Sequence, residues 1–169
     1  MTLLIRPEAE ADREAVRQVN RLAFGGKAEA RLVDRLRDGG HARVSLVAEL
    51  GGAVVGHVLF SGLPIVTERG TVPALSLAPL AVLPGHQRQG VGSELVRRGL
   101  EVCRERGHRI VLVLGHPVFY PRFGFSADLA RPLESPFGGG EAWMATELVP
   151  GALENVSGRV EYPPPFGDL

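Results

Sequence analysis

The sequence predicts an α/β (α+β) fold, in which a mixed β-sheet of about six to seven strands is flanked by about four helices. Three patterns carry this prediction. Two amphipathic helical patterns follow a short first strand, a nearly continuous apolar stretch covers residues 74–83, and a third amphipathic helix leads into the apolar run at residues 110–114. Such runs are typical of strands buried on both faces, so we expect helices on both sides of the sheet.

The N-terminal part of the chain predicts one strand and two helices. Residues 3–5 form a short apolar strand that Pro7 stops. From Glu8 onward, apolar residues recur at three-and-four spacing as far as Gly25-Gly26, and the pattern resumes over residues 27–38. The glycine pair is a helix-stop signal, so we expect two helices joined by a flexible turn.

The middle of the chain predicts four strands, at residues 43–50, 53–61, 63–67 and 72–82. Gly51-Gly52, between the first two, is a signal for a tight hairpin. The apolar stretch at residues 74–83 is expected in the centre of the sheet, but Pro79 lies inside it and cannot donate a ladder hydrogen bond. We therefore predict a bulge or local splay near residues 78–80.

The C-terminal half begins with a long amphipathic helix that follows Gly90 and ends at Gly107. The strand at residues 110–114 is its expected parallel partner in a strand–helix–strand unit. His116-Pro117 starts a short helical turn that contains Tyr120. The sequence then predicts a strand after Gly124-Phe125, a loop at residues 131–140, a last strand at residues 142–149 and an extended tail over about residues 150–169.

Length and composition predict one soluble domain spanning residues 1–169. Lys and Arg together number 19, as do Asp and Glu, so no net charge favours nucleic acid or an anionic membrane. The single cysteine, Cys103, cannot form an intramolecular disulfide, and no His, Asp or Glu set has metal-site spacing. We expect a cytoplasmic protein, because no signal peptide or membrane-length apolar run is present.

The stretch from residue 77 to residue 93, LAPLAVLPGHQRQGVGS, carries the main functional signal. A strand that runs into a glycine-bearing turn and a helix start can bind an anion, because the first amides of a helix have no partner inside it. The dinucleotide fingerprint requires a third glycine, but Leu95 stands at that position. A Walker loop requires Gly-Lys-Ser/Thr, and Lys27 is the only lysine in the chain.

Two segments resemble the signatures of the GNAT superfamily, the Gcn5-related N-acetyltransferases. Gln87-Arg88-Gln89-Gly90-Val91-Gly92 matches its Q/R-x-x-G-x-G/A motif, and Tyr120-Pro121-Arg122-Phe123-Gly124-Phe125 resembles its Y-x-x-x-G-F segment. The element order agrees over essentially the whole chain, which is most similar to a branch of predicted bacterial acetyltransferases. The resemblance implies a GNAT-type sheet that is splayed open for a cofactor.

That resemblance implies an N-acetyltransferase that uses acetyl-CoA as co-substrate and moves its acetyl group to a primary amine by direct attack. The backbone of Gln87, Arg88, Gln89, Gly90, Val91, Gly92 and Ser93 would cradle the pyrophosphate, and Leu80, Ala81 and Val82 would pair with the pantetheine arm. The amide of Leu80 or Ala81 would polarise the thioester carbonyl, and Tyr120 would donate a hydrogen bond to the leaving thiolate. The alternative is a non-catalytic acyl-CoA-binding or sensing module on the same fold.

The general base and the acceptor stay open at this stage. The apolar stretch at residues 74–82 carries no carboxylate, which leaves Glu49, His57 and a water ordered by Ser76 as candidates. The acceptor is a small-molecule or protein amine, and a homodimer is compatible with the resemblance. We expect the acceptor near the segments at residues 21–27, 63–71 and 131–140. Four charged residues, Arg122, Arg131, Glu134 and Glu141, are compatible with charge selection, but the sequence favours a solvated surface role for each.

Overall fold

The computed structural model describes residues 2–169. Its strands are β1 (Leu3–Pro7), β2 (Ala42–Leu50), β3 (Ala53–Gly62), β4 (Ile65–Thr67), β5 (Gly70–Val72), β6 (Leu75–Val82), β7 (Ile110–Leu114), β8 (Leu133–Glu134), β9 (Trp143–Glu147) and β10 (Gly158–Val160). Its α-helices are α1 (Arg13–Phe24), α2 (Ala28–Asp38), α3 (Val91–Glu105) and α4 (Ala127–Ala130). Its 3-10 helices are η1 (Glu10–Asp12), η2 (Pro84–His86), η3 (Tyr120–Phe123), η4 (Gly140–Ala142) and η5 (Pro164–Asp168).

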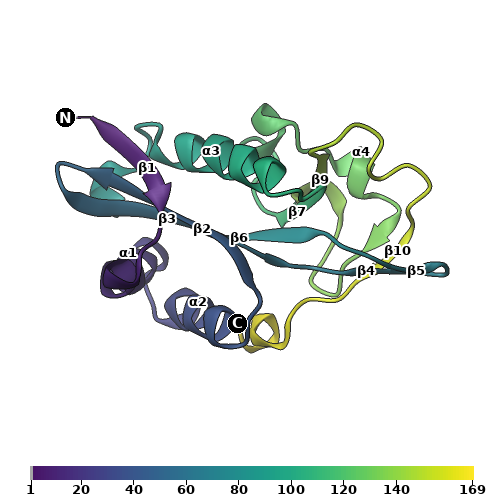
Figure 1. Cartoon of the computed structure of the whole chain (residues 1–169), viewed down its shortest axis with the longest axis horizontal. Coiled ribbons are helices and arrows are strands. Elements are labelled where there is room, and N and C mark those ends of the chain that lie inside the picture. The colour runs from purple at the N-terminus through teal and green to yellow at the C-terminus, as the bar shows by residue number, and fades with distance from the viewer. Residues whose placement is uncertain (1) are drawn as a thin grey trace.

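The main sheet has six strands in the order β1-β2-β3-β6-β7-β9. Helix α3 covers one face of this sheet, and α1 and α2 cover the other (Figure 1). One buried cluster packs α3 on the sheet through Leu95, Val96 and Phe60, and a second packs α1 and α2 on it through Val16 and Leu36. The expected mixed sheet with helices on both faces is therefore confirmed.

The main sheet splits between β6 and β7, which are parallel. Their pairing comprises only Leu75 with Val111 and Ser76 with Leu112, whereas β6 stays paired with β3 as far as Val82. The register between β3 and β6 also shifts between Val58 and Phe60, opposite the region of Pro79. The predicted splay near residues 78–80 is thus present, and it leaves one edge of β6 open beyond Ser76.

A second sheet of four short strands, in the order β5-β4-β10-β8, extends from the far end of the main sheet (Figure 1). We expected one strand over residues 72–82, but β5 ends at Val72 and β6 starts at Leu75. Pro73 lies between them, where a missing amide donor interrupts the ladder. The strands that we predicted for a single sheet are thus divided between two sheets.

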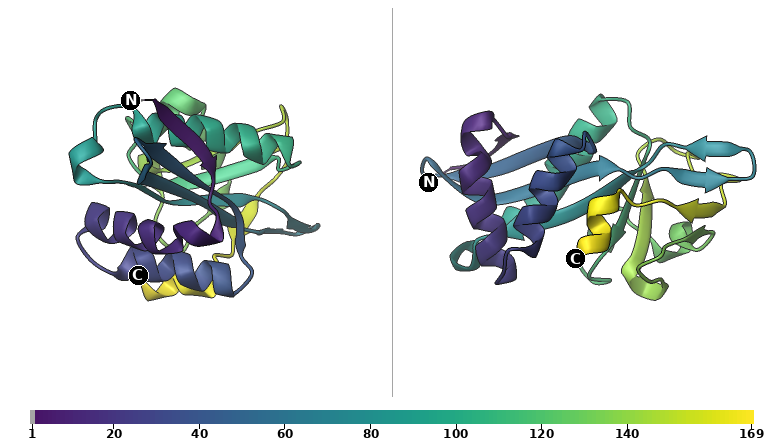
Figure 2. Two further views of the ribbon diagram at one scale, coloured as in Figure 1. Left: turned by 60° about the vertical axis from the view of Figure 1, so that its left-hand side comes forward. Right: turned by 90° about the horizontal axis from the view of Figure 1, so that it is seen from below.

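Two further segments differ from expectation. Residues after Phe125 form α4 rather than a strand, because the Ser126 hydroxyl caps the helix by accepting from the amides of Asp128 and Leu129. The expected extended tail contains β10, which pairs with β4 and β8, and η5. Helix η5 lies beside α2, as Figures 1 and 2 show, because Phe166 is buried in the cluster beneath the sheet. The expected loop at residues 131–140 likewise contains β8.

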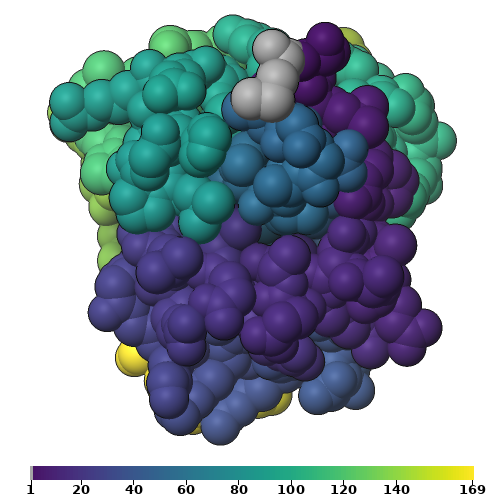
Figure 3. All heavy atoms as spheres, turned by 90° about the vertical axis from the view of Figure 1, so that its left-hand side faces the viewer, coloured from purple at the N-terminus to yellow at the C-terminus, as the bar shows by residue number. Residues whose placement is uncertain are grey.

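The segment that carries the glycine motif lies at one end of the molecule. Figure 3 shows the teal residues around 84–93 above the purple pair α1 and α2, with the turn between β2 and β3 alongside. This turn is the predicted hairpin, in which Leu50 pairs with Ala53 and Gly51 and Gly52 have φ angles of 59° and 84°. The start of α3 and the two N-terminal helices therefore meet at the same end of the sheet.

Candidate functional site

A cavity of about 770 Å³ lies where the sheet splits. Its walls come from both faces of the sheet: from α1 and α2, from the residues of β6 beyond Leu75, from the turn that leads into α3, and from the segment between β7 and η3. Because β7 has diverged from β6 at this point, the cavity connects the side of α3 with the side of α1 and α2. The split in the sheet is thus the structural origin of the cavity.

The open edge of β6 offers backbone hydrogen-bonding groups to this cavity. The amide of Leu83 bonds to the carbonyl of Val55 on β3, and such bonds alternate along an antiparallel pair. The alternation directs the backbone of Ala81 toward β3 and that of Leu80 and Val82 toward the open edge. The Gln87 side chain confirms this for Val82, because its Nε2 donates to the Val82 carbonyl at 2.9 Å.

The start of α3 supplies further unpaired amides. Helix α3 begins at Val91, preceded by Gly90 in the left-handed region with a φ angle of 87°. The amide of Glu94 is the first to bond back into the helix, to the Gly90 carbonyl at 3.1 Å. The preceding amides, including those of Gly92 and Ser93, have no such partner, and the helix dipole adds partial positive charge there. This arrangement suits an anionic ligand.

Arg122 adds a full positive charge beside the start of α3. Its Nη2 lies 3.4 Å from Ser93 Oγ, and its guanidinium stacks over the Phe119 ring, 4.7 Å from the centroid. Stacking, together with a hydrogen bond from Nε to the Phe119 carbonyl at 3.3 Å, holds the planar group in place. The sequence favoured a solvated surface role for Arg122, with charge selection near the acceptor as the alternative, whereas the structure places it in the cavity wall beside the start of α3.

Tyr120 lies in the cavity wall between aromatic neighbours. Its side chain is nearly buried, and edge-to-face contacts join it to Phe119 at 5.0 Å and to Phe125 at 5.6 Å between ring centroids. Burial raises the pKa of Tyr120 to about 12. Gly115 leaves room for the Tyr120 ring in this position, because a Cβ on residue 115 would lie 2.5 Å from the ring. The hydroxyl is therefore a stable hydrogen-bond donor in this setting.

The three candidate bases lie away from the cavity. The Glu49 carboxylate pairs with Arg6 at 3.1 Å, and Ser76 is buried within the closed part of the sheet. His57 belongs to β3 and is fully buried, with Nε2 at 2.9 Å from Ser45 Oγ and Nδ1 at 3.1 Å from Asn20 Nδ2. Burial, reinforced by the charge of Arg37, lowers the pKa of His57 to about 3. A neutral, enclosed imidazole cannot exchange protons with a substrate in this cavity.

Most residues expected around acetyl-CoA line this one cavity. They are Leu80, Val82, Gln87, Arg88, Gly90, Gly92, Ser93 and Tyr120. The side chains of Ala81 and Val91 point into the core, and Gln89 lies at the surface with its Nε2 3.5 Å from the Gly85 carbonyl. Cys103 is buried, which raises its pKa to about 12, so its thiol is no nucleophile.

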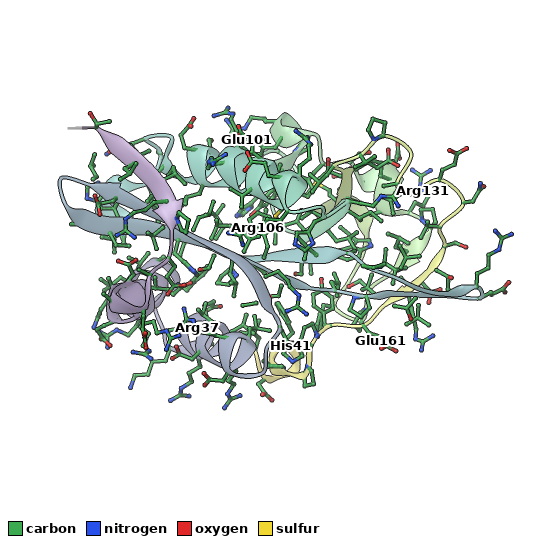
Figure 4. The ribbon with its side chains drawn as sticks, viewed as in Figure 1. Arg37, His41, Glu101, Arg106, Arg131 and Glu161 are labelled. Carbon is green, nitrogen blue, oxygen red and sulfur yellow. The ribbon has the colours of Figure 1, made fainter. Side chains whose placement is uncertain are left out.

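Several lining residues were missed by reasoning from the sequence. Phe24 lies in the expected segment at residues 21–27, but Glu29, Leu32, Gly115 and Phe119 carry no motif. Leu32 has the spacing of an ordinary core residue, and nothing local distinguishes Glu29 from the other acidic residues of the helix. Residues 63–71 and 131–140 do not reach this cavity, and Arg131, Glu134 and Glu141 line a different one near β8. Arg131 lies at the end of the molecule remote from α1 (Figure 4).

Across residues 2–169, no group of three or more His, Cys, Asp or Glu side chains is arranged to bind a metal ion. Over the same residues, the helices are all too short or too polar to cross a bilayer.

Comparisons with known proteins show the family of this chain. The model of the family "Acetyltransferase (GNAT) domain" matches residues 4–127. The uncharacterized N-acetyltransferase YhbS of Escherichia coli K12 is 36% identical over 162 residues, which are 95% of this chain and 96% of YhbS. The uncharacterized N-acetyltransferase YjhQ of the same strain is 42% identical over 132 residues, 75% of this chain and 73% of YjhQ.

Two solved structures share the fold throughout. The crystal structure of Escherichia coli YhbS in complex with CoA has a TM-score of 0.90 and 35% identity, and the match covers 98% of this chain and 92% of that one. A GNAT family acetyltransferase from Brucella melitensis, in complex with acetyl-CoA, has a TM-score of 0.82 and 32% identity over 98% of both chains. On the family match and these relatives, the chain belongs to the GNAT acetyltransferase family.

Proposed function

We propose that this chain works as one N-acetyltransferase domain, which moves the acetyl group of acetyl-CoA to a primary amine by direct attack. The observation that carries the proposal is the cavity, in which the start of α3, the open edge of β6 and Tyr120 face the same space. The CoA and acetyl-CoA complexes of the two relatives support the choice of co-substrate.

The residues around the cavity fit the polar and apolar parts of acetyl-CoA. The unpaired amides at the start of α3, within residues 87–93, would bind the pyrophosphate, and Arg122 would add charge-assisted hydrogen bonds. The open edge of β6 at Leu80 and Val82 would pair with the amides of the pantetheine arm. Ala81 would contribute by holding β6 on β3 rather than by contacting the arm.

Acetyl transfer needs a polarised carbonyl and a stabilised leaving group. The neutral amine attacks the thioester carbon, a C–N bond forms, the C–S bond breaks, and one proton leaves the nitrogen. The Leu80 amide is our choice of donor to the carbonyl oxygen, because the alternation along β6 directs it toward the open edge. We therefore propose Leu80 rather than Ala81 as the carbonyl donor.

Tyr120 is proposed to donate a hydrogen bond to the departing thiolate rather than a proton. Its pKa is raised to about 12, whereas a thiol has a pKa of roughly 8.5. Full proton transfer from the phenol to the thiolate would therefore be uphill by about 5 kcal/mol. A hydrogen bond stabilises the developing charge without that transfer, and solvent supplies the proton to the released CoA.

Release of free thiol from acetyl-CoA over a panel of primary amines tests the proposed reaction. We expect amine-dependent release, and mass spectrometry should identify the acetylated amine. Gly92→Val should weaken CoA binding at least about tenfold, because its side chain would enter the space bounded by Leu80, Val82 and Phe119. Gly139→Val is the control, since a Cβ at Gly139 meets no atom within 4 Å and the residue lies outside the cavity.

Two results would contradict the proposal in different ways. Unchanged CoA affinity in Gly92→Val would show that the cavity is not the CoA site. Tight CoA binding by the wild-type protein, with no thiol release for any amine, would favour the non-catalytic acyl-CoA-binding module instead.

A further inference from the structure

The cavity has two chemically different ends. One end, at the start of α3 and at η3, carries the basic residues Arg88 and Arg122. The other end, formed by α1 and α2, carries Phe24, Glu29 and Leu32. We call the second group the α1–α2 end. The two ends lie on opposite faces of the main sheet, which Figure 1 shows between α3 and the pair α1 and α2.

Glu29 is the only acidic side chain that lines the cavity within residues 2–169. The other ionisable lining groups are His86, Arg88, His116, Tyr120 and Arg122, all on the side of α3 and η3. The Glu29 side chain is half-buried in the first turn of α2. Among the side chains of residues 2–169 that line the cavity, Glu29 is thus the single acidic one, and it lies at the end opposite to the basic residues.

Three arginines of α1 and α2 pair with acidic residues other than Glu29. Those pairs are Arg17 with Asp34, Arg35 with Asp168, and Arg37 with Glu8. Within residues 2–169, no basic side chain lies within 4 Å of the Glu29 carboxylate. Partial burial removes water from a carboxylate and costs free energy. A hydrogen-bonded cationic partner offsets this cost.

The surroundings of Glu29 are apolar and partly exposed. Phe24 is 45% exposed to solvent and Leu169 is 61% exposed, although both are large apolar residues that line the cavity. Leu77 and Pro79 of β6 extend this apolar wall toward the open edge. Exposed apolar groups around a concave site are typical of ligand contacts.

We infer that Glu29 selects the acceptor, and that the acceptor is a cationic primary amine on an apolar body without an adjacent carboxylate. This inference rests on the proposed acetyl transfer, and it names the class of amine. The Glu29 carboxylate would hold the ammonium group before its proton is lost, while Phe24 and Leu32 contact the apolar part. An acidic acceptor, such as a free α-amino acid, would place a second carboxylate near Glu29, and repulsion would weaken its binding.

Two probes with the same apolar body test this inference. They are 2-phenylethylamine and phenylalanine, which differ by the α-carboxylate. Calorimetric titration of the CoA-saturated protein should show at least about tenfold tighter binding of 2-phenylethylamine, the effect expected for one charge-assisted contact. In Glu29→Gln this preference should fall to nearly onefold, and in Glu29→Lys it should reverse.

Asp38→Asn is the matched control. Asp38 is an exposed carboxylate at the other end of the same helix, outside the cavity, so this variant should keep the wild-type preference. Thermal midpoints and CoA affinity should match the wild type in all variants, which separates loss of selection from loss of folding. Equal binding of the two probes by the wild-type protein, or an unchanged preference in Glu29→Gln, would overturn the inference.

Turnover separates this inference from the proposed function. A preference that depends on Glu29, together with thiol release, supports both. The same preference without thiol release supports the acceptor site and contradicts acetyl transfer. Thiol release from other amines, with no measurable binding of 2-phenylethylamine, overturns the inference and leaves the proposed reaction standing.

Discussion

The hydroxyl group of Tyr120 illustrates how a single residue's surroundings decide its chemical role. The ring packs against Phe119 and Phe125, and burial raises the pKa of Tyr120 to about 12. The hydroxyl therefore stays protonated through the pH range in which most enzymes are assayed. In the proposed mechanism, it would offer the thiolate a hydrogen bond that does not vary with pH.

Tyr120→Phe should lower kcat about 10- to 100-fold, the effect of losing one hydrogen bond to a charged group, and should leave the KM for acetyl-CoA nearly unchanged. Because the pKa is about 12, Tyr120 should cause no decline in rate below about pH 11. Initial rates of thiol release measure both effects.

Tyr162→Phe is the control, since that buried tyrosine lies outside the cavity. An unchanged kcat, with chemistry shown to limit the rate, would remove Tyr120 from the mechanism.

His57 is a second residue whose surroundings fix its protonation state. Neutral His57 donates from Nε2 to Ser45 Oγ, which in turn donates to Glu8 Oε1 at 2.6 Å. Glu8 lies 3.9 Å from His57 Nε2, but its charge is matched by Arg37 at 2.5 Å. Arg37 lies in the layer of α1 and α2 beneath the sheet (Figure 4). The network thus favours the neutral imidazole, in keeping with a pKa of about 3.

His57 should make the protein less stable in acid. The unfolded chain binds a proton at His57 below about pH 6.5, whereas the folded chain does so only near pH 3, so stability is lost as the pH falls through that window. Between pH 7.5 and pH 5.0, the wild-type free energy of unfolding should fall by about 2 kcal/mol more than that of His57→Gln. Urea titrations at the two pH values measure this difference.

The control for His57 is Val58→Ala, which weakens the same strand without removing a titratable group. This variant should be less stable at both pH values and should keep the wild-type pH dependence. Equal pH dependence in wild type and His57→Gln would show that His57 titrates normally and that the network does not hold it neutral.

At the scale of elements, α3 packs closely against β3, because a glycine on each element faces a large side chain on the other. A Cβ on Gly99 of α3 would lie 2.5 Å from the Phe60 ring, and one on Gly56 of β3 would lie 3.0 Å from Leu95 Cδ1. Both glycines are placed where the two elements touch. This close contact fixes the position of α3, and hence of its N-terminus at the cavity.

Gly99→Ala should therefore destabilise the protein by about 1–3 kcal/mol through overpacking, although alanine by itself favours the helix by about 1 kcal/mol. Denaturant unfolding measures the change. In the double variant with Phe60→Leu the two effects should be less than additive, since the smaller side chain relieves the overlap. A Gly99→Ala variant at least as stable as the wild type would contradict the close contact.

Local patterns predicted most elements, but not those that depend on distant partners. Gly51-Gly52 predicted the hairpin, and the amphipathic pattern after Gly90 predicted α3, because these signals lie within the segments themselves. Strand β10 has only three residues and exists through its pairing with β4 and β8. Ser126 carries a helix-capping signal within its own segment, and the residues after it form α4 instead of the predicted strand.

The site follows the same rule. Gln87, Arg88, Gly90, Gly92, Ser93 and Tyr120 belong to continuous motifs, so their place at the cavity could be predicted. Glu29 and Leu32 come from another layer of the molecule, and only the split between β6 and β7 connects them to those motifs. Nothing in the local sequence of α2 reports that its first turn faces a cavity. The sequence shows that β6 carries no carboxylate. It does not show that Glu29 of α2 lines the same cavity.

At the scale of the whole molecule, the two halves of the main sheet are joined at one short seam. The pairs Leu75–Val111 and Ser76–Leu112 are the full parallel contact between β6 and β7 within residues 2–169. On one side of the seam lie β1, β2, β3 and β6, and on the other lie β7 and β9. Beyond the seam, β6 has a partner on one edge only.

At that open edge, the pantetheine arm of acetyl-CoA would form hydrogen bonds with β6 in place of a neighbouring strand. Such bonds should slow the exchange of the β6 amides with deuterium. In the free protein, the amides of Leu80 and Val82 should exchange with deuterium faster than that of Ala81, which faces β3. Saturating acetyl-CoA should slow Leu80 and Val82 at least about tenfold. Val111, at the closed seam, is the reference, and its rate should change far less. Equal slowing along all of β6 and β7 would instead indicate general stiffening.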